Sequence, residues 1–460
     1  MTRIVIVGGG PAGYEAALVA AQFGAEVTVV DPDGLGGSCV RTDCVPSKTL
    51  IAATETLGSA AAERLGATAG APTGLTVDWP AVNARVKTLA RAQSADIEAR
   101  LAREGVRVVR GTGRFVGPGR LLARDASGAE RELGADVVLI ATGATPRVIP
   151  GAEPDGERIL SWRDLYDVPE PPERLVVVGS GVTGAEFASA YQAMGVEVSL
   201  VSSRQRLLPG EDEDAALLVE GVFRRRGMTI YDRSRAARVL RRADGVVVEL
   251  EDGRRIEGSH ALMAVGSVPN TGGLGLELAG ITVDRGGYVP VDRVSRTGAA
   301  GIYAAGDCTG VLPLASVAAM QGRIAMWHAL GDAVAPLRLS TVAATVFTDP
   351  EIATVGVTGD VAVAAGVEAR VVSLPLATNA RAKMQGIAEG FVKLYSRPGT
   401  GTVLGGVVVA PHASELILPL SMAVQNALTV GQLAHSFAVY PSLSGSLTEA
   451  ARQLMEQTPT

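Results

Sequence analysis

The feature that most constrains the fold of this chain is a glycine-rich unit that occurs twice, about 170 residues apart. The first copy reads TRIVIVGGGPAGYEAALVAAQFGAEVTVVD and begins at Thr2. Its apolar run at 4–7 predicts a buried strand, residues 14–23 predict an alanine-rich helix, and residues 25–30 predict a second strand. This order of strand, glycine loop, helix and strand predicts the βαβ unit of a dinucleotide-binding domain.

Three glycines of the first unit, Gly8, Gly10 and Gly13, form the pattern G-x-G-x-x-G. Gly8 permits a tight turn, Gly10 lets a pyrophosphate approach the backbone, and Gly13 allows the helix to pack closely. The phosphates then face the N-terminus of the helix. Asp31 ends the second strand, about 20 residues after Gly10, where a carboxylate can accept a hydrogen bond from a ribose hydroxyl. The unit therefore suits an adenosine whose 2′-hydroxyl is free.

The second unit, RLVVVGSGVTGAEFASAYQAMGVEVSLVSSRQR, repeats the pattern with Gly179, Gly181 and Gly184. Its second strand ends without an acid, in the sequence SSRQR at 202–206. A carboxylate at this place would repel a 2′-phosphate, whereas Ser203 and Arg204 can bind one. This ending predicts that the second site accepts NADPH, alongside NADH. The alternative is that the arginines are ordinary solvated surface residues.

The chain is predicted to be an α/β protein with two Rossmann-like dinucleotide-binding domains and a C-terminal α+β domain that serves dimerisation. Linkers are indicated by proline-rich stretches at 146–154 and 169–172 and by a change in the sequence pattern after residue 331. We expect the first dinucleotide-binding domain at 1–150 and 274–338, the second at 151–273, and the interface domain at 339–460.

Sequence periodicity predicts several further elements. Helical spacing covers 48–64 and 79–104, and short apolar runs predict strands at 106–110, 113–115, 121–124 and 135–140. In the C-terminal region, alternating patterns predict antiparallel strands at 343–347, 391–395 and 403–409, followed by helices at 414–426 and 447–456.

Charge and composition argue against several classes of protein. The net charge is −6, from 48 acidic and 42 basic residues, which disfavours a nucleic acid as the main partner. The first predicted strand begins at Arg3, too early for a signal peptide, and no uncharged apolar window reaches about 18 residues. We therefore expect a soluble, cytoplasmic protein without membrane insertion. Three cysteines in 460 residues make no disulfide scaffold, and their spacing does not suit a metal site.

Together these motifs resemble the pyridine nucleotide–disulfide oxidoreductase family, which includes dihydrolipoamide dehydrogenase and glutathione reductase. Besides the two glycine-rich units, the resemblance rests on four stretches: the C-x4-C-V-P-S-K motif at 39–48, A-T-G at 141–143, V-G-S-V-P-N at 265–270 and G-I-Y-A-A-G-D at 301–307. It covers essentially the whole chain.

The resemblance implies FAD at the first unit, NADPH or NADH at the second, and a homodimer built mainly by the C-terminal domain. The residues implied beyond the glycine loops are Thr142, Gly143, Gly306 and Asp307 for FAD, with Asp307 directed at the ribityl chain, and Gly266 for NAD(P)H.

Two charged residues have implied roles at the flavin. Lys48 matches the family's lysine near flavin N5, where a positive charge stabilises the anionic reduced flavin. Glu186 matches the acid that pairs with this lysine on the nicotinamide side. Because Glu186 lies near the start of a predicted helix, it can also be interpreted as a simple partner of the helix dipole.

Cys39 and Cys44 lie five residues apart in the stretch GGSCVRTDCVPSK. In a regular helix such residues are separated by roughly 8–9 Å between Cα atoms, whereas a disulfide requires less than about 7 Å. The pair can therefore bond only if the backbone between the two residues is not a regular helix, and Pro46 and the flanking glycines permit this without forcing it. By the resemblance, Cys44 faces the flavin and Cys39 exchanges with a disulfide substrate.

The chain departs from the family where disulfide exchange needs a base. The family motif H-P-x-x-S-E reads Y-P-S-L-S-G here, so that Tyr440 replaces the histidine and Gly445 replaces its orienting glutamate. A phenol ionises near pH 10 and an imidazole near pH 6.5, so a tyrosine is a poor proton carrier at neutral pH. Asp43 also replaces a common glycine, and a carboxylate beside Cys44 disfavours the thiolate.

These departures favour an enzyme that passes electrons from NAD(P)H through FAD to a quinone or another small acceptor, a reaction that needs neither thiol exchange nor a base. They resemble an actinobacterial subgroup of the family described as NAD(P)H quinone reductases. Two alternatives stay open. The first is a true disulfide reductase, such as dihydrolipoamide dehydrogenase, which uses the cysteine pair. The second is a flavin-bound redox sensor.

Overall fold

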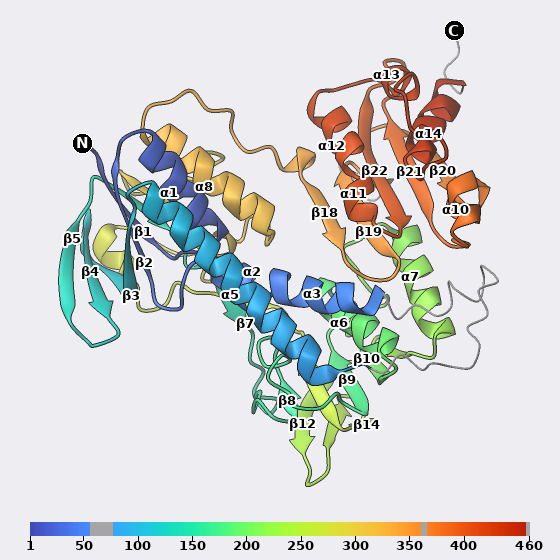
Figure 1. Ribbon diagram of the computed structural model, residues 1–460, viewed down its shortest axis with the longest axis horizontal. Helices are drawn as coiled ribbons and strands as arrows, with labels where there is room; N and C mark the ends of the chain where they lie inside the picture. The colour runs from blue at the N-terminus through green and yellow to red at the C-terminus, as the bar shows by residue number, and fades with distance from the viewer. Residues whose placement is uncertain (56–76, 360–365, 457–460) are drawn as a thin grey trace. The chain divides into compact units, whose positions relative to one another are not determined.

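The computed structural model describes residues 1–55, 77–359 and 366–456 (Figure 1). They form two compact units. The first unit comprises Met1–Thr49, Pro80–Arg147 and Gly266–Arg338, and the second comprises Leu50–Trp79, Val148–Val265 and Leu339–Thr460. The domain boundaries given above stay a prediction.

The first unit is built on a seven-stranded sheet of order β17-β6-β1-β2-β3-β4-β5. The neighbours from β17 to β3 are parallel, and β4 and β5 continue the sheet antiparallel. Every residue of β1 after the first is buried, as expected for a parallel strand covered on both faces. The strands are β1 (Arg3–Val7), β2 (Glu26–Asp31), β3 (Arg107–Gly117), β4 (Arg120–Asp125), β5 (Glu130–Gly134), β6 (Val137–Ile140) and β17 (Ile302–Ala304).

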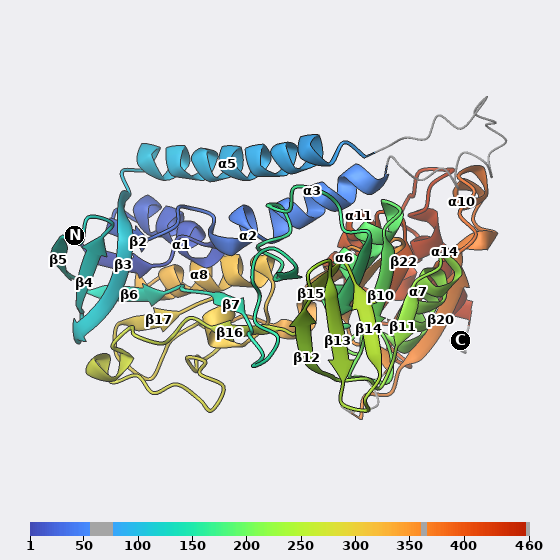
Figure 2. The same cartoon turned by 90° about the horizontal axis from the view of Figure 1, so that it is seen from below.

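Helices cover one face of this sheet. α1 (Pro11–Gln22) and α8 (Ala315–Ala329) pack together there, and α5 (Trp79–Arg103) adds Ile97 and Leu101 to the same core (Figure 2). The opposite face packs against the β3–β5 hairpins and a segment that includes Leu276 and Val289. The carboxyl ends of β1, β6 and β17 therefore meet at one edge, beside the N-terminus of α1.

The second unit begins with a parallel sheet of order β11-β10-β9-β15-β8 and an antiparallel sheet of order β12-β13-β14. α6 (Val182–Ala193) follows β9, and α7 (Glu213–Arg225) follows β10. The strands are β8 (Ile159–Leu160), β9 (Arg174–Val178), β10 (Glu197–Val201), β11 (Thr229–Tyr231), β12 (Ala236–Arg241), β13 (Val246–Leu250), β14 (Arg255–Gly258) and β15 (His260–Met263).

The C-terminal part of the second unit is an antiparallel sheet of order β18-β19-β22-β21-β20, covered by helices. The strands are β18 (Ala343–Val346), β19 (Glu351–Gly356), β20 (Arg370–Pro375), β21 (Phe391–Ser396) and β22 (Val403–Ala410), and the helices are α10 (Ala380–Met384), α11 (Ala413–Leu416), α12 (Leu418–Gln425), α13 (Val430–Ala434) and α14 (Gly445–Glu456).

A buried ion-pair cluster joins this C-terminal sheet to α7. The Lys393 Nζ on β21 lies 2.7 and 2.9 Å from the two carboxylate oxygens of Asp212 and 2.6 Å from Asp214 Oδ2. The Tyr395 hydroxyl donates to Asp212 Oδ2 at 3.1 Å. Asp212 also caps α7 by accepting from Ala215 N, so one carboxylate fixes both the helix and the strand.

Two element predictions need correction. The sequence predicts separate strands at 106–110 and 113–115, but β3 is continuous, because a Cβ at Gly111 would lie 2.1 Å from Arg124 O. This glycine permits close pairing with β4 and does not break the strand. The predicted helix at 414–426 is two helices, α11 and α12, because Pro419 at the start of α12 cannot donate to the preceding turn.

The other elements agree with the predictions or lie partly outside the described residues. The predicted helix at 79–104 is α5, and that at 447–456 is α14. Of the helix predicted at 48–64, the described part belongs to α3 (Cys44–Glu55), and residues 56–64 lie outside the described residues. Within the described ranges, no helix has the length and apolar character needed to cross a membrane.

Candidate active site

The first glycine loop has the geometry of a phosphate-binding turn. Gly8 has a φ of +106°, and a Cβ there would lie 2.2 Å from Ala141 O. A Cβ at Gly13 would lie 1.9 Å from Gly8 O, so only glycine lets α1 pack this closely on the loop. α1 begins with Gly10 as its N-cap and Pro11 at N1, and its first turn holds no acidic residue. The loop therefore fits the pyrophosphate of a dinucleotide.

Asp31 holds the loops on both sides of the predicted ribose position. It is 6% exposed, and its Oδ2 accepts from Gly9 N at 2.7 Å. Its Oδ1 accepts from Gly34 N at 2.7 Å and Asp33 N at 2.9 Å. A contact with a ribose hydroxyl would use the remaining lone pairs of these oxygens, so Asp31 fixes the backbone of the site as well as being a predicted ligand.

The motifs at 141–143 and 301–307 meet at the same edge of the first sheet. Asn270 donates from Nδ2 to Thr142 O and from its backbone N to Gly143 O, both at 2.9 Å. Gly306 is buried with a φ of +81°, and its N–H donates to Gln321 Oε1 at 2.9 Å. Hydrogen bonds from Asn270 and to the Gln321 side chain therefore fix the backbone of both turns.

Asp307 follows β17 at this edge and is half-buried. Burial raises the pKa of its carboxyl, and the nearby Asp43 carboxylate raises it further. Cys308 is fully buried, and its thiol donates to Ala305 O at 3.3 Å. It is the small interior residue that its context predicts.

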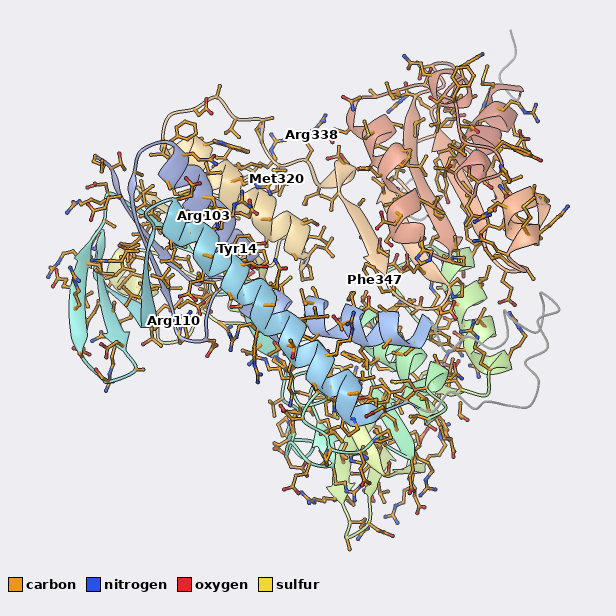
Figure 3. All side chains as sticks on the ribbon, in the orientation of Figure 1. Tyr14, Arg103, Arg110, Met320, Arg338 and Phe347 are labelled. Carbon is orange, nitrogen blue, oxygen red and sulfur yellow. The ribbon has the colours of Figure 1, made fainter. Side chains whose placement is uncertain are left out.

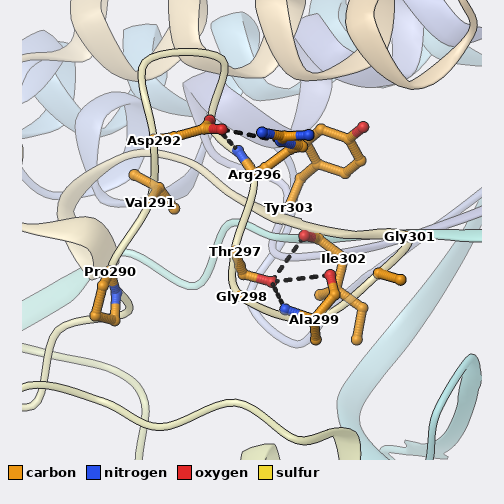
Figure 4. Close-up of a pocket in the computed structure, with 11 residues that line it drawn as sticks. Pro290, Val291, Asp292, Arg296, Thr297, Gly298, Ala299, Gly301, Ile302 and Tyr303 are labelled. Carbon is orange, nitrogen blue, oxygen red and sulfur yellow. Dashed lines mark hydrogen bonds and ion pairs between the residues drawn. The ribbon is translucent and has the colours of Figure 1, made fainter.

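The pocket in Figure 4 has a volume of about 550 Å³ and lies in the loop that precedes β17. Its two charged side chains already pair with each other, since Arg296 Nε donates to Asp292 Oδ2 at 2.9 Å. Thr297 Oγ1 donates to Ile302 O at 2.8 Å. These bonds hold the start of β17, whose other end carries Asp307.

Cys39 and Cys44 lie on two different helices. Cys39 belongs to α2 (Gly37–Arg41), and α3 begins at Cys44 after a break at Thr42 and Asp43. The backbone between the two cysteines is therefore not a regular helix, which is the condition for a disulfide given above. Both are free thiols, joined by a hydrogen bond between their side chains.

The hydrogen bond between the two thiols shifts their pKa values in opposite directions. It lowers the pKa of Cys39 below its ordinary value, although burial and Asp43 oppose the shift. It raises the pKa of Cys44, and burial and Asp43 raise that pKa further. Lys48, one turn into α3, lowers both values. The thiols, Asp43, Asp307 and Lys48 therefore form one electrostatic cluster.

The second glycine loop repeats the geometry of the first. Gly179 has a φ of +119°, and a Cβ there would lie 2.1 Å from Ala264 O. A Cβ at Gly184 would lie 1.9 Å from Gly179 O. Gly181 is the N-cap of α6, where an added Cβ would meet nothing within 4 Å. This loop also fits a pyrophosphate at a helix N-terminus.

The turn after β10 presents exposed Ser203 and Arg204 beyond buried Ser202. The Ser202 hydroxyl bonds Ser180 Oγ at 2.7 Å and so ties this turn to the glycine loop. Arg206, in contrast, lies 3.2 Å from Glu213 Oε1 in an ion pair.

One further residue lies beside the turn after β10. Arg233 was not predicted from the sequence, and its N–H donates to Arg204 O at 2.9 Å, which places a second exposed arginine beside the turn. No local sequence signal identifies it, since a tertiary contact brings it there. Gly266, predicted from the resemblance to contact NAD(P)H, belongs to the first unit, where it is exposed and its carbonyl accepts from Arg147 N at 2.9 Å.

Glu186 does not lie in the first turn of α6. It is the fifth residue of the helix and is 3% exposed, so the interpretation as a simple helix-dipole partner is wrong. Its Oε1 accepts a hydrogen bond from Phe347 N at 2.9 Å. This contact links α6 to the segment that follows β18.

Tyr440 and Gly445 lie near the start of the last helix of the second unit. Tyr440 is 85% exposed, and Gly445 begins α14 with its N–H donating to Ser442 Oγ at 3.2 Å. Neither position supplies the imidazole and carboxylate of a His–Glu pair.

The chain belongs to the pyridine nucleotide–disulphide oxidoreductase family. The family model matches residues 2–322, and the model of the family's dimerisation domain matches residues 342–451. The predicted fold class, with two nucleotide-binding domains and a C-terminal dimerisation domain, is confirmed. The family uses FAD with NADH or NADPH, so the predicted cofactors are confirmed as well.

The chain can also be compared with individual members of this family. The chain is 59% identical to a protein of Mycobacterium tuberculosis H37Rv named NAD(P)H dehydrogenase (quinone), over 99% of this chain and 94% of that one. It is 34% identical to the dihydrolipoyl dehydrogenase of Chlorobaculum tepidum, over 97% of this chain and 96% of that one. The crystal structure of LpdA from M. tuberculosis, 59% identical, superposes with a TM-score of 0.94 over 99% of this chain and 100% of that one.

Proposed function

We propose that this protein is an FAD-dependent NAD(P)H dehydrogenase that delivers electrons to a quinone or a similar small acceptor. The observation that carries the proposal is the 59% identity, over 99% of the chain, to a relative named NAD(P)H dehydrogenase (quinone). The replacement of the family's His–Glu pair by Tyr440 and Gly445 supports it, because quinone reduction needs no base for thiol exchange.

Bound FAD supplies two-electron transfer between a reduced nicotinamide and an acceptor. The first glycine loop and Asp31 would hold its adenosine diphosphate, and Asp307 would hold the ribityl chain together with the Thr142–Gly143 turn. Lys48 would place a positive charge where the reduced flavin is anionic. Glu186 would act on the nicotinamide side, and the second loop with Ser203, Arg204 and Gly266 would hold the nucleotide.

We also propose a homodimer formed through the C-terminal domain. The match to the dimerisation-domain model supports it, as does the exposure of large apolar side chains in this part of the chain. Leu418, Met422, Phe437, Val439 and Tyr440 are all more than half exposed. Light scattering coupled to gel filtration tests the assembly, and a monomer at micromolar concentration would contradict it.

Turnover assays test the function directly. Purified holoenzyme should oxidise NADPH or NADH rapidly with a soluble quinone and only slowly with lipoamide. The second candidate, a disulfide reductase, is favoured by one observation, the hydrogen-bonded pair Cys39 and Cys44. Lipoamide turnover as fast as quinone turnover would replace the first proposal by the second.

A further inference from the structure

The segment after β18 is held against α6 by two hydrogen bonds on one helical face. Phe347, labelled in Figure 3, donates from its backbone N to Glu186 Oε1 at 2.9 Å, and Asp349 N donates to Ser189 Oγ at 3.1 Å. The two acceptors lie three residues apart in α6, so they face the same side. Both are buried, with 3% of Glu186 and 6% of Ser189 exposed.

The same segment is held from a second helix. Arg226, the C-cap of α7, donates from Nη1 to Asp349 O at 3.0 Å and pairs through Nη2 with Asp349 Oδ2 at 2.9 Å. Within the segment, Thr348 Oγ1 donates to Pro350 O at 2.7 Å. Asp349 is therefore fixed at its N–H, carbonyl and carboxylate. The neighbouring Phe347 N–H is thereby held at a defined position.

We propose that Ser189 is a positioning residue for Glu186. Its hydroxyl fixes Asp349 N, which keeps Phe347 N–H on the Glu186 carboxylate and so fixes the orientation of that carboxylate. The inference rests on the proposed function in one respect, the placement of Glu186 at the nicotinamide. It adds that Ser189, which is not among the predicted cofactor-binding residues, sets the geometry of that acid through a segment of the C-terminal region.

The consequence follows from the chemistry of a buried carboxylate. A backbone N–H that donates to the ionised form stabilises that form, so loss of the donor raises the pKa of the acid. Replacing Ser189 by alanine leaves the Asp349 N–H without its acceptor, and we expect the segment to shift so that this N–H finds another partner. This shift withdraws Phe347 N–H from Glu186.

The test compares Ser189→Ala with a matched control, Ser259→Ala. Ser259 is 7% exposed, lies in the same unit, and accepts a backbone hydrogen bond from Arg174 N at the same distance, 3.1 Å. Ser189→Thr retains the hydroxyl and should restore the parent behaviour. Arg226→Gln loosens the segment from α7 and carries the test if Ser189→Ala does not fold.

The first readout is independent of catalysis. Hydrogen exchange of the Phe347 and Asp349 amides, measured in the holoenzyme without nucleotide, should be about tenfold faster in Ser189→Ala and Arg226→Gln. The same amides should exchange at the parent rate in Ser259→Ala. Unchanged exchange in both loosening variants would overturn the proposal.

The second readout is the pH dependence of flavin reduction by NADPH in a stopped-flow instrument. In Ser189→Ala the acid limb of the profile should move to higher pH, and the plateau should fall by about tenfold. A profile identical to that of Ser259→Ala would also overturn the proposal. Neither readout needs an acceptor, so a failure to reduce quinones would refute the proposed function and leave this inference standing.

Discussion

A substitution of Arg204 tests whether this residue makes the second site prefer NADPH over NADH. Its side chain is exposed on the turn after β10 and makes no hydrogen bond or ion pair within the described part of the chain. Arg206, two residues on, is already paired with Glu213 at 3.2 Å. The perturbation is Arg204→Ala, which removes the guanidinium available to a 2′-phosphate and leaves the glycine loop unchanged.

The size of the effect follows from the exposure of this side chain. A hydrogen bond to a charged group contributes about 1.5–3 kcal/mol, and solvent screening at an exposed site places the value near the lower end. About 1–1.5 kcal/mol corresponds to a loss of roughly five- to tenfold in kcat/KM for NADPH. NADH lacks the phosphate, so its kcat/KM should change by less than about twofold.

The assay measures initial rates with a fixed quinone and either NADPH or NADH, from about 0.05 to 0.5 M salt. The ratio of the parent's kcat/KM for NADPH to that of Arg204→Ala should fall as salt screens the contact between the guanidinium and the 2′-phosphate. Arg206→Ala is the control and should change NADPH use by less than about twofold, because Glu213 already occupies that guanidinium. Equal losses for both nucleotides, or no loss with NADPH, would refute the reasoning.

Three further changes have defined outcomes. Cys39→Ser should leave quinone turnover nearly unchanged in steady-state assays, because the proposed electron path does not pass through the thiols. Lys393→Met leaves the buried Asp212 carboxylate without its counter-ion and should cost about 3–5 kcal/mol in urea unfolding. Asp307→Asn should stabilise the flavin-free protein at neutral pH, because burial and Asp43 raise the pKa of the Asp307 carboxyl and so make its ionised form unfavourable in the folded state. The same variant should lose its flavin more readily on dialysis.

Each of these changes has a control. A loss of quinone turnover beyond tenfold in Cys39→Ser would place the thiols on the path. Arg225→Ala breaks an exposed pair with Glu389 and should cost less than about 1 kcal/mol, and a cost equal to that of Lys393→Met would contradict the role of burial. The gain in Asp307→Asn should vanish as the pH falls below the ordinary carboxyl range, where the parent residue is protonated in both states; a gain that persists there has another cause.

The parts of the site that depend on local backbone geometry could be predicted from the sequence. The glycine loops are such parts, because a Cβ at Gly13 or Gly184 would overlap a carbonyl oxygen only a few residues away. The flanking glycines and Pro46 permitted the break between Cys39 and Cys44 but did not require it.

The parts that depend on contacts between distant segments could not be predicted. Arg233 reaches the nucleotide turn through a backbone bond across 29 residues, to Arg204. Ser189 meets a segment that lies 160 residues further along the chain. The burial of Glu186, which is 3% exposed, could not be predicted from its place near the start of the helix either.

The buried cluster around Lys393 limits how this chain can be divided. Asp212 caps α7 and also receives the ammonium and phenol groups of β21, so the nucleotide-binding part of the second unit lacks a counter-ion once β21 is cut away. A fragment that ends before residue 339 would keep the Asp212 cap of α7 but would lose the ammonium and phenol groups that β21 supplies to this carboxylate. Truncation, domain exchange and insertion are therefore expected to succeed only where Asp212 and β21 are kept in the same polypeptide.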